Sequence, residues 1–435
     1  MNEVSALTMC PSHPNVVQLF GICDEGRTLA QHLAKTTLET VAAKSLSADQ
    51  WTKSSAPSRH CSSGDSNRQW RKDYKGSDSD ADNVSSSQVT SPVSSTHASS
   101  HFSRLEVISY NTLKQATNDF NERKIDEGGS LIAAGSFGQV FLGNWQDQRV
   151  AVKRLKKPKD ERLSTVRLSK KQYRNEMLAL TRCPSHPNVV RLLGISDDGP
   201  EMCLVYEYVD GMTLAQHLAK ESSEPLSWNE RLEVAHGSAK GIHHIQTTPQ
   251  RPLIHRDIKS ANILVSPDGR VIVADFGLSC FVEHVDNMDA SFYDSGSMAV
   301  GTRSYMSPEA CKGIISTRTD VYSFGVVLFE LLTGLPPYFS SKKLDLVIWL
   351  KGMEREGVDL MSMCDPRAAW PDRVARLLFD LAKRCTDFDS HRRPFIREVL
   401  QELDRVSRMG LQGILGMCLR ADRLEEVIEG RGNKQ

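Results

Sequence analysis

The chain has 435 residues and a mass of 48.5 kDa, and its 54 basic residues balance its 54 acidic residues. A net charge of zero gives no indication of a nucleic-acid partner or of an anionic membrane surface. A hydrophobic content of 39% and a charged content of 25% are typical of a globular protein. The ten cysteines include no C-x-x-C pair, so free thiols in a reducing cytosol are favoured over a zinc or thioredoxin-type site.

The most apolar run of the chain, residues 324–332, is too short to span a membrane and is interrupted by Glu330. The chain begins with Met1 and Asn2, which fit neither a signal peptide nor the glycine motif of myristoylation. From these features we expect a cytoplasmic protein without a membrane span.

The N-terminal part of the chain repeats a later part. Residues 2–22 match residues 175–195, and residues 28–35 match residues 213–220, with 12 residues missing from the first copy. We interpret residues 1–50 as a partial duplicate and not as an independent domain, because the fragment is too short to bury a core. A remnant of tandem duplication and an error in the assembled reading frame both explain it. A segment that competes for the docking surface of the second copy is a third explanation.

Residues 51–101 are rich in serine and poor in large apolar side chains. Such a composition cannot bury enough apolar surface to offset the entropy lost on ordering. We therefore predict a disordered linker.

Three features in the next hundred residues suit a nucleotide. Residues 132–140, IAAGSFGQV, fit a glycine-rich loop at Gly135 and Gly138, although Ala133 stands where a first glycine is expected. Lys153 ends a β-rich Val-Ala-Val-Lys run, and Glu176 follows on a helical pattern. A glycine loop alone is weak evidence, and a Lys-Glu pair is often only surface charge.

The stretch from residue 253 to 278, LIHRDIKSANILVSPDGRVIVADFGL, carries the strongest signal. Asp257 precedes Lys259 and Asn262 at fixed offsets, and Asp275 opens the Asp-Phe-Gly run. Between them, two β-rich runs flank a Pro-Asp-Gly turn, which predicts a hairpin that brings Asn262 and Asp275 together. A charged triplet alone would be a chance feature, but the combined HRD-x-K-x-x-N and DFG pattern is too long to arise by chance.

These residue types suit phosphoryl transfer, which requires positioning and charge stabilisation more than covalent chemistry. One carboxylate faces the attacking hydroxyl and one cation contacts the moving phosphoryl group. An amide and a second carboxylate supply oxygen ligands for magnesium.

On these motifs, residues 102–410 resemble a eukaryotic protein kinase. The lead-in at residues 109–123, SYNTLKQATNDFNER, with Gly128 and Gly129 after it, is similar to that of the interleukin-1-receptor-associated and Pelle-like kinases. Plant receptor-like kinases carry a similar lead-in. The resemblance implies the tyrosine-kinase-like group and serine/threonine specificity.

The resemblance also implies an α+β fold of two lobes. The small β-rich lobe would comprise residues 102–206, the hinge residues 207–211, and the larger, mainly helical lobe residues 212–410. Residues 411–435 would form an amphipathic tail.

By the same resemblance, Asp257 orients the acceptor hydroxyl or takes its proton, and Lys259 steadies the γ-phosphoryl group. Asn262 and Asp275 hold Mg²⁺, with Mn²⁺ as an alternative. Lys153, paired with Glu176, fixes the phosphates of ATP, and Tyr206 is the gatekeeper. The full implied nucleotide set is Ala133, Gly135, Ser136, Phe137, Gly138, Val140, Ala151, Lys153, Glu176, Tyr206, Glu207, Val209, Leu264 and Asp275.

Regulation by phosphorylation is a further expectation. Ser291, Ser295 and Ser297 are candidate sites, and Ser297 is best placed, four residues before Gly301. Its phosphate would pair with Arg256 and with the basic residues of the preceding helix, namely Lys170, Lys171 and Arg174. Ser279-Cys280 stands where many such kinases carry a basic residue, which weakens this expectation.

Several structural contacts are also implied. Thr302 would bond to Asp257 and Lys259, Glu309 would pair with Arg393, and Asp320 would anchor the backbone of the catalytic loop. An apolar helix is predicted over residues 321–332, ending at Gly334. Ser307 replaces a usual alanine, with little expected effect.

Two alternatives remain open at this point. A catalytically silent pseudokinase scaffold is supported by Ala133, by Ser279-Cys280 and by the unusual N-terminus. The second alternative is a death-domain adaptor, but the sequence before residue 102 offers nothing from which that domain could be built. Expected partners are protein substrates, with an upstream receptor or adaptor as a further candidate, and no nucleic acid.

Overall fold

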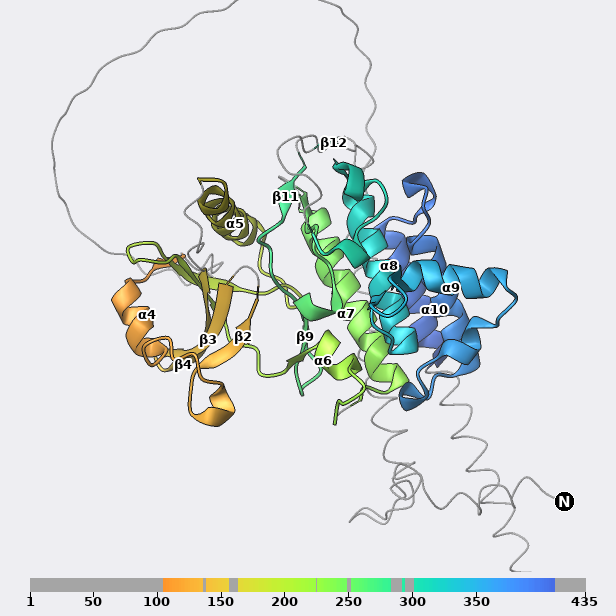
Figure 1. Ribbon diagram of the computed structural model, residues 1–435, viewed down its shortest axis with the longest axis horizontal. Coiled ribbons are helices and arrows are strands. Elements are labelled where there is room, and N and C mark those ends of the chain that lie inside the picture. Colours follow the sequence, from red (N-terminus) through yellow and green to blue (C-terminus); the bar gives the residue numbers. More distant parts are fainter. Residues whose placement is uncertain are drawn as a thin grey trace, which may run out of the picture. The chain divides into compact units, whose positions relative to one another are not determined.

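The computed structural model describes residues 105–135, 138–155, 163–223, 225–248, 252–282, 292–293 and 301–410. All of them belong to one compact unit, Phe102–Gly413 (Figure 1). The predicted duplicate at residues 1–50, the linker at 51–101 and the tail at 411–435 lie outside the described residues. So do Ser136 and Phe137 of the glycine-rich loop and the three candidate phosphorylation sites.

The small lobe is a six-stranded sheet with the strand order β1-β5-β6-β4-β3-β2 (Figure 1). Neighbouring strands are antiparallel except β1 and β5, which are parallel. The strands are β1 (Glu106–Val107), β2 (Leu131–Ala134), β3 (Gly138–Trp145), β4 (Gln148–Leu155), β5 (Leu192–Ser196) and β6 (Cys203–Glu207). Alternation along β3 and β4 places Phe141, Val150 and Val152 in the core of the sheet, as expected for strands with one buried face.

The lead-in segment folds onto this sheet. Helix α4 (Tyr110–Ala116) is capped by the hydroxyl of Ser109, which accepts a hydrogen bond from the backbone N–H of Thr112. Its Leu113 is fully buried, and Phe120 packs edge-to-face on Phe141. The longer helix α5 (Leu163–Arg182), which carries Glu176, packs against β5 and against the short strand β11 (Cys280–Phe281).

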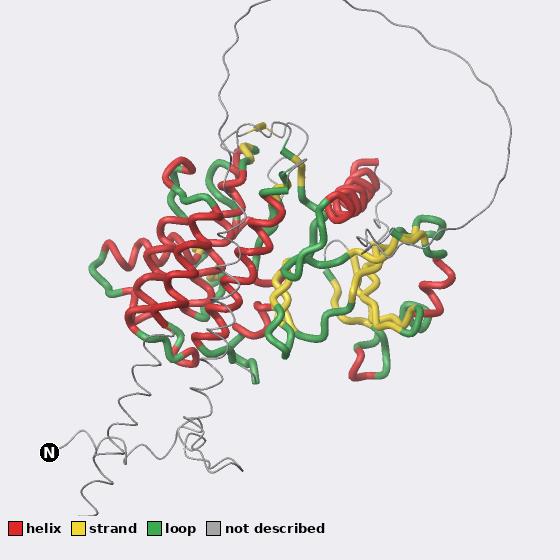
Figure 2. Tube along the Cα trace, turned by 180° about the vertical axis from the view of Figure 1, so that it is seen from behind, coloured by secondary structure: helices red, strands yellow, loops and turns green. Residues whose placement is uncertain are grey.

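The large lobe is mainly helical (Figure 2). Its helices are α6 (Leu214–Leu218), α7 (Trp228–Gln246), α8 (Thr317–Thr333), α9 (Leu346–Arg355) and α10 (Asp372–Cys385), and residues 396–410 are also helical. Ser227 and Glu230 form the capping box that opens α7. Nearly every residue of α8 is buried, as an apolar helix at the centre of a lobe should be.

Helix α8 begins earlier than its apolar run predicts. The hydroxyl of Ser316 caps it by accepting from the N–H of Arg318, so the polar first turn is helical as well. It ends as predicted at Gly334, which adopts a left-handed conformation with φ of 62°.

Besides the six-stranded sheet, the described residues form several small sheets of two or three short strands. The predicted hairpin forms between β9 (Ile263–Val265) and β10 (Val271–Val273), and β7 (Met212–Thr213) joins it. The remaining pairs are β8 (Leu253–Ile254) with β11 (Cys280–Phe281), β12 (Phe292–Tyr293) with β13 (Ile314–Ile315), and β14 (Tyr338–Phe339) with β15 (Leu344–Asp345). The predicted α+β fold, with a β-rich lobe and a helical lobe, is confirmed.

Candidate active site

Asp257 is held by donors on both of its carboxylate oxygens. Its Oδ2 accepts from Lys259 Nζ at 2.6 Å and from Asn262 Nδ2 at 3.1 Å. Its Oδ1 accepts from the backbone N–H of Thr302 at 3.1 Å and from its Oγ1 hydroxyl at 2.8 Å. Thr302 Oγ1 also accepts from Lys259 Nζ at 3.0 Å. The carboxylate is therefore fixed in orientation and carries a cation beside it, which suits a group that aligns a hydroxyl.

Helix α8 anchors the loop before Asp257 through the carboxylate of Asp320. Asp320 accepts hydrogen bonds from the backbone N–H groups of His255 at 2.9 Å and Arg256 at 2.8 Å, and from Gln246 Nε2 at 3.1 Å. Arg256 has a positive φ of 69°, which costs energy in a non-glycine residue and persists only where neighbours fix it. The predicted anchoring by Asp320 is confirmed. Burial raises the pKa of its carboxyl group.

Lys153 contacts two carboxylates, Glu176 in the small lobe and Asp275 in the large lobe. Its Nζ lies 2.7 Å from Glu176 Oε2 and 2.7 Å from Asp275 Oδ1. Burial alone would lower the pKa of Lys153, but the two carboxylates outweigh it and the pKa lies above its ordinary value. Burial would likewise raise the pKa of Asp275, but the ion pair with Lys153 outweighs it and holds the pKa below its usual range. Lys153 and Asp275 are therefore both charged at neutral pH.

Asn262 and Asp275 lie on either side of the open end of the hairpin, as predicted. Ile263 pairs with Val273, and the N–H of Ala274 donates to the carbonyl oxygen of Asn262 at 2.9 Å. Asp275 has a positive φ of 67°.

The same two side chains fit a divalent cation. Among the described residues, neither Asn262 Oδ1 nor Asp275 Oδ2 has a hydrogen-bond partner, which leaves two hard oxygen ligands available. The described residues contain no group of three or more His, Cys, Asp or Glu side chains that could hold a metal alone. A cation here would therefore complete its coordination with phosphate oxygens and water.

The predicted adenine-side residues lie on β4, β6, β9 and the segment after β6. Tyr206 is buried, and burial together with the charge of Glu176 raises the pKa of its hydroxyl. Glu207 ends β6, and the backbone of Val209 makes no hydrogen bond within the described residues. Ala151 and Leu264 are partly buried against the main core.

The glycine-rich loop is described only at its ends. Ala133 is exposed on β2 and pairs with Val140, so the strand accommodates it in place of a glycine. A Cβ atom at Gly138 would lie 2.4 Å from the carbonyl oxygen of Arg154, which explains the glycine there. Gly135 has open space around it, and its N–H donates to the carbonyl oxygen of Gly138. The roles of these residues stay predictions.

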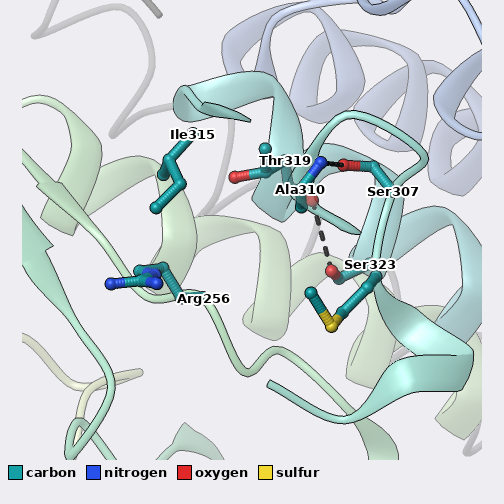
Figure 3. A pocket seen from close by; sticks show the side chains of 7 residues that line it. Arg256, Ser307, Ala310, Ile315, Thr319 and Ser323 are labelled. Atoms are coloured by element: carbon teal, nitrogen blue, oxygen red, sulfur yellow. Dashed lines mark hydrogen bonds between the residues drawn. The ribbon is translucent and has the colours of Figure 1, made fainter. Parts of the chain in front are cut away.

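Arg256 lines a pocket with six other residues (Figure 3). They are Met306, Ser307, Ala310, Ile315, Thr319 and Ser323. Ile315 belongs to β13, whose partner strand β12 lies in the segment that carries the candidate phosphorylation sites. Lys170, Lys171 and Arg174 are exposed on α5.

The structure also shows contacts that the sequence did not predict. Ser260 Oγ lies 2.8 Å from Glu330 Oε1 and 3.0 Å from Tyr305 Oη, and the Tyr305 hydroxyl donates to Glu330 Oε2 at 2.9 Å. The available signal was Glu330 itself, a carboxylate inside an otherwise apolar helix. Ser307 Oγ, moreover, donates to Glu309 Oε1 at 2.7 Å.

Glu309 and Arg393 form the predicted ion pair. Arg393 Nη1 and Nη2 lie 2.6 and 2.8 Å from the two carboxylate oxygens of Glu309, which is the two-pronged geometry of strong guanidinium pairs. Arg393 is almost fully buried. The pair ties the segment after the active site to the end of the large lobe.

Comparison with known families explains this geometry. The family model of the protein kinase domain matches residues 127–403, which is more than half of the chain. The chain belongs to the protein kinase family. The predicted family is therefore confirmed, and a kinase domain uses ATP with a divalent cation.

The kinase has many relatives among plant receptor-like kinases, and three from Arabidopsis thaliana illustrate them. A probable receptor-like protein kinase is 33% identical over 76% of this chain and 39% of its own length. A probable LRR receptor-like serine/threonine-protein kinase is 33% identical over 71% of this chain and 32% of its own length. Wall-associated receptor kinase-like 14 is 34% identical over 69% of this chain and 41% of its own length.

The kinase thus spans only about two fifths or less of the length of these three relatives. No helix in the described part of the chain is long and apolar enough to cross a membrane.

Proposed function

We propose that this kinase transfers the γ-phosphate of Mg-ATP to serine or threonine hydroxyls of proteins. The observation that carries the proposal is the set of donors on Asp257. Its two oxygens are engaged by Lys259, Asn262 and Thr302, while Lys153 connects Glu176 to Asp275. A pseudokinase commonly lacks one of these charged groups, and here they are all present and in contact.

The proposed roles follow from position. Asp257 accepts a hydrogen bond from the acceptor hydroxyl and directs its oxygen in line with the phosphoryl group. Lys259, beside Asp257, stabilises the charge on that group, and Lys153 does so for the other phosphates. Asn262 and Asp275 hold the cation, for which Mg²⁺ is proposed and Mn²⁺ is an alternative. The bound cation supplies compensation for phosphate charge.

We further propose the domain organisation that the sequence predicts, namely a partial duplicate at residues 1–50, a linker at 51–101, a kinase domain at 102–410 and a tail at 411–435. The receptor-like names of the relatives support an upstream receptor or adaptor as a partner. Phosphorylation of Ser295 or Ser297 is proposed as the activating event. Strand β12 ends at Tyr293, two residues before Ser295, and its partner β13 reaches the pocket of Arg256.

The test is phosphate transfer from labelled Mg-ATP by the full chain, beside Asp257→Asn, followed by phosphoamino-acid analysis. We expect label on serine or threonine, and a loss of at least about 100-fold in the variant, because a positioned general base contributes about that much or more. The variant should still bind ATP. Equal activity in the two proteins would contradict the assignment of Asp257, and label on tyrosine alone would contradict the specificity.

A further inference from the structure

Arg303 is an exposed cation next to the proposed catalytic carboxylate. It begins the 3-10 helix η4 (Arg303–Tyr305) and directly follows Thr302, whose hydroxyl lies 2.8 Å from Asp257 Oδ1. The side chain of Arg303 is exposed and makes no hydrogen bond or ion pair within the part of the chain that the structure describes. Such a guanidinium is available to a ligand at no cost of breaking an internal contact.

The backbone that carries Arg303 is fixed on both sides. Thr302 is bonded to Asp257 by its N–H and its hydroxyl. Tyr305 is bonded through its hydroxyl to Glu330, and its carbonyl oxygen accepts from Ser323 Oγ at 2.7 Å. Consecutive Cα atoms are about 3.8 Å apart. The backbone of Arg303 therefore lies directly beside that of Thr302, whose N–H and hydroxyl contact Asp257.

Within the part of the chain that the structure describes, the elements next to η4 present no exposed carboxylate to neutralise this cation. The turn η3 (Ser260–Asn262) exposes Ala261, and the elements that pack on that turn, β7 and α6, contain no Asp or Glu. Helix α8 packs on η4, but its two acidic side chains, Asp320 and Glu330, are 0% and 3% exposed. Glu309, further along the chain, is paired with Arg393.

We propose that Arg303 selects acceptor sites that carry an aspartate or glutamate one or two residues from the phosphorylated hydroxyl. A guanidinium matches a carboxylate in a two-pronged geometry, and its charge attracts acidic peptides over basic ones. This inference rests on the proposed function, because it names the substrate class of the same site.

The test uses the full chain and a set of peptides with one serine, in which a single flanking position is Asp, Ala or Arg. The quantity compared is the ratio of kcat/KM for the Asp peptide to kcat/KM for the Ala peptide, which cancels any general loss of activity. The variants are Arg303→Ala, Arg303→Glu and Arg303→Lys. The matched control is Lys312→Ala, which removes another exposed cation at the end of η5 (Ala310–Lys312).

We expect the wild-type ratio to be about three to ten at one flanking position, the range of a charged contact at a partly exposed site. Arg303→Ala should bring the ratio to about one, Arg303→Glu should favour the Arg peptide, and Arg303→Lys should keep part of the preference. Lys312→Ala should keep the wild-type ratio. The effect should appear in KM more than in kcat and should weaken as salt is added.

An active chain with the same ratios in wild type and Arg303→Ala would overturn the assignment of Arg303 alone. Failure of Arg303→Glu to shift the preference towards the Arg peptide would do the same. A chain that binds ATP but transfers no phosphate to any peptide or to itself would overturn the proposed function and this inference together.

Discussion

Two regions of the kinase hold acidic side chains in opposite ways. Around Lys153, the carboxylates of Glu176 and Asp275 share one ammonium group at 2.7 Å each. In α8, Asp320 and Glu330 are bonded only to neutral donors within the described residues, namely backbone N–H groups, an amide and hydroxyls. Burial raises the pKa of Glu330 to about 8, whereas that of Asp275 is held below its usual range.

The difference distinguishes the carboxylates of the candidate active site from those that stabilise the fold. A cation partner alone, however, does not identify an active-site carboxylate. Glu309 also has a cation partner, and yet both of its oxygens are occupied by Arg393. Asp275, by contrast, is 28% exposed at its side chain and keeps one oxygen without a partner among the described residues. An ionised carboxylate with an open oxygen is what a metal requires, and Asp275 has both properties.

The largest expected effect concerns the scaffold region. Asp320→Ala removes a fully buried carboxylate that accepts three hydrogen bonds and should cost about 3–5 kcal/mol of unfolding free energy. Urea unfolding measures it, with Asp380→Ala as the control, since Asp380 forms an exposed pair with Lys383 and should change stability by about 0.5 kcal/mol or less. A loss under about 1 kcal/mol in Asp320→Ala would show that the anchoring contributes little.

The next effect concerns the cation of the site region. Lys153→Met should lower kcat/KM for peptide phosphorylation by at least about 100-fold, or about 2.7 kcal/mol, because the phosphates lose their cation. Steady-state kinetics measure it. The control is Lys114→Met, which removes a lysine from an exposed pair with Asp119. If the two variants retained similar activity, the Lys153 pair would be structural only.

A third effect separates the two regions by its dependence on pH. An acid with a raised folded-state pKa binds its proton more tightly when folded, so its contribution to stability falls as pH rises from its ordinary 4.5 through about 8. Glu330→Gln should therefore match wild type within about 1 kcal/mol at low pH and exceed it above pH 8. Urea midpoints at several pH values between these limits test this. Parallel curves for the two proteins would show that Glu330 is not protonated in the fold.

The smallest effect concerns Ser307, whose hydroxyl donates to the already paired Glu309. Ser307→Ala restores the residue that the family resemblance leads us to expect there. The substitution should cost about 1 kcal/mol, the value of one buried hydrogen bond. Thermal unfolding measures it, and a cost above about 3 kcal/mol would mean that Glu309 also loses Arg393.

The sequence predicted the contacts whose partners stand at fixed offsets within recognised motifs. Asp257, Lys259 and Asn262 lie within six residues, so one loop conformation brings them together, and the Pro-Asp-Gly turn determines the hairpin to Asp275. The α8 anchor at Asp320 was also predicted, from family resemblance and not from local physics.

Other contacts could not be predicted because they depend on tertiary packing. Ser260, Tyr305 and Glu330 are separated by 25 to 70 residues and meet only once α8 is placed under the catalytic loop. The sequence identified Glu330 only as a charge that interrupts an apolar run. The prediction also missed the polar first turn of α8. It relied on apolar periodicity, which neither that turn nor its cap Ser316 shows.

The most direct test of the central claim is the effect of Mg²⁺ on ATP affinity in wild type and Asp275→Asn, measured by calorimetry without any need for turnover. If Asp275 holds the cation, wild type should bind ATP at least about tenfold more tightly with Mg²⁺ than without it, and the variant should lose most of that gain. An unchanged gain in Asp275→Asn would contradict the account, because the open carboxylate beside Lys153 would then not be the metal site.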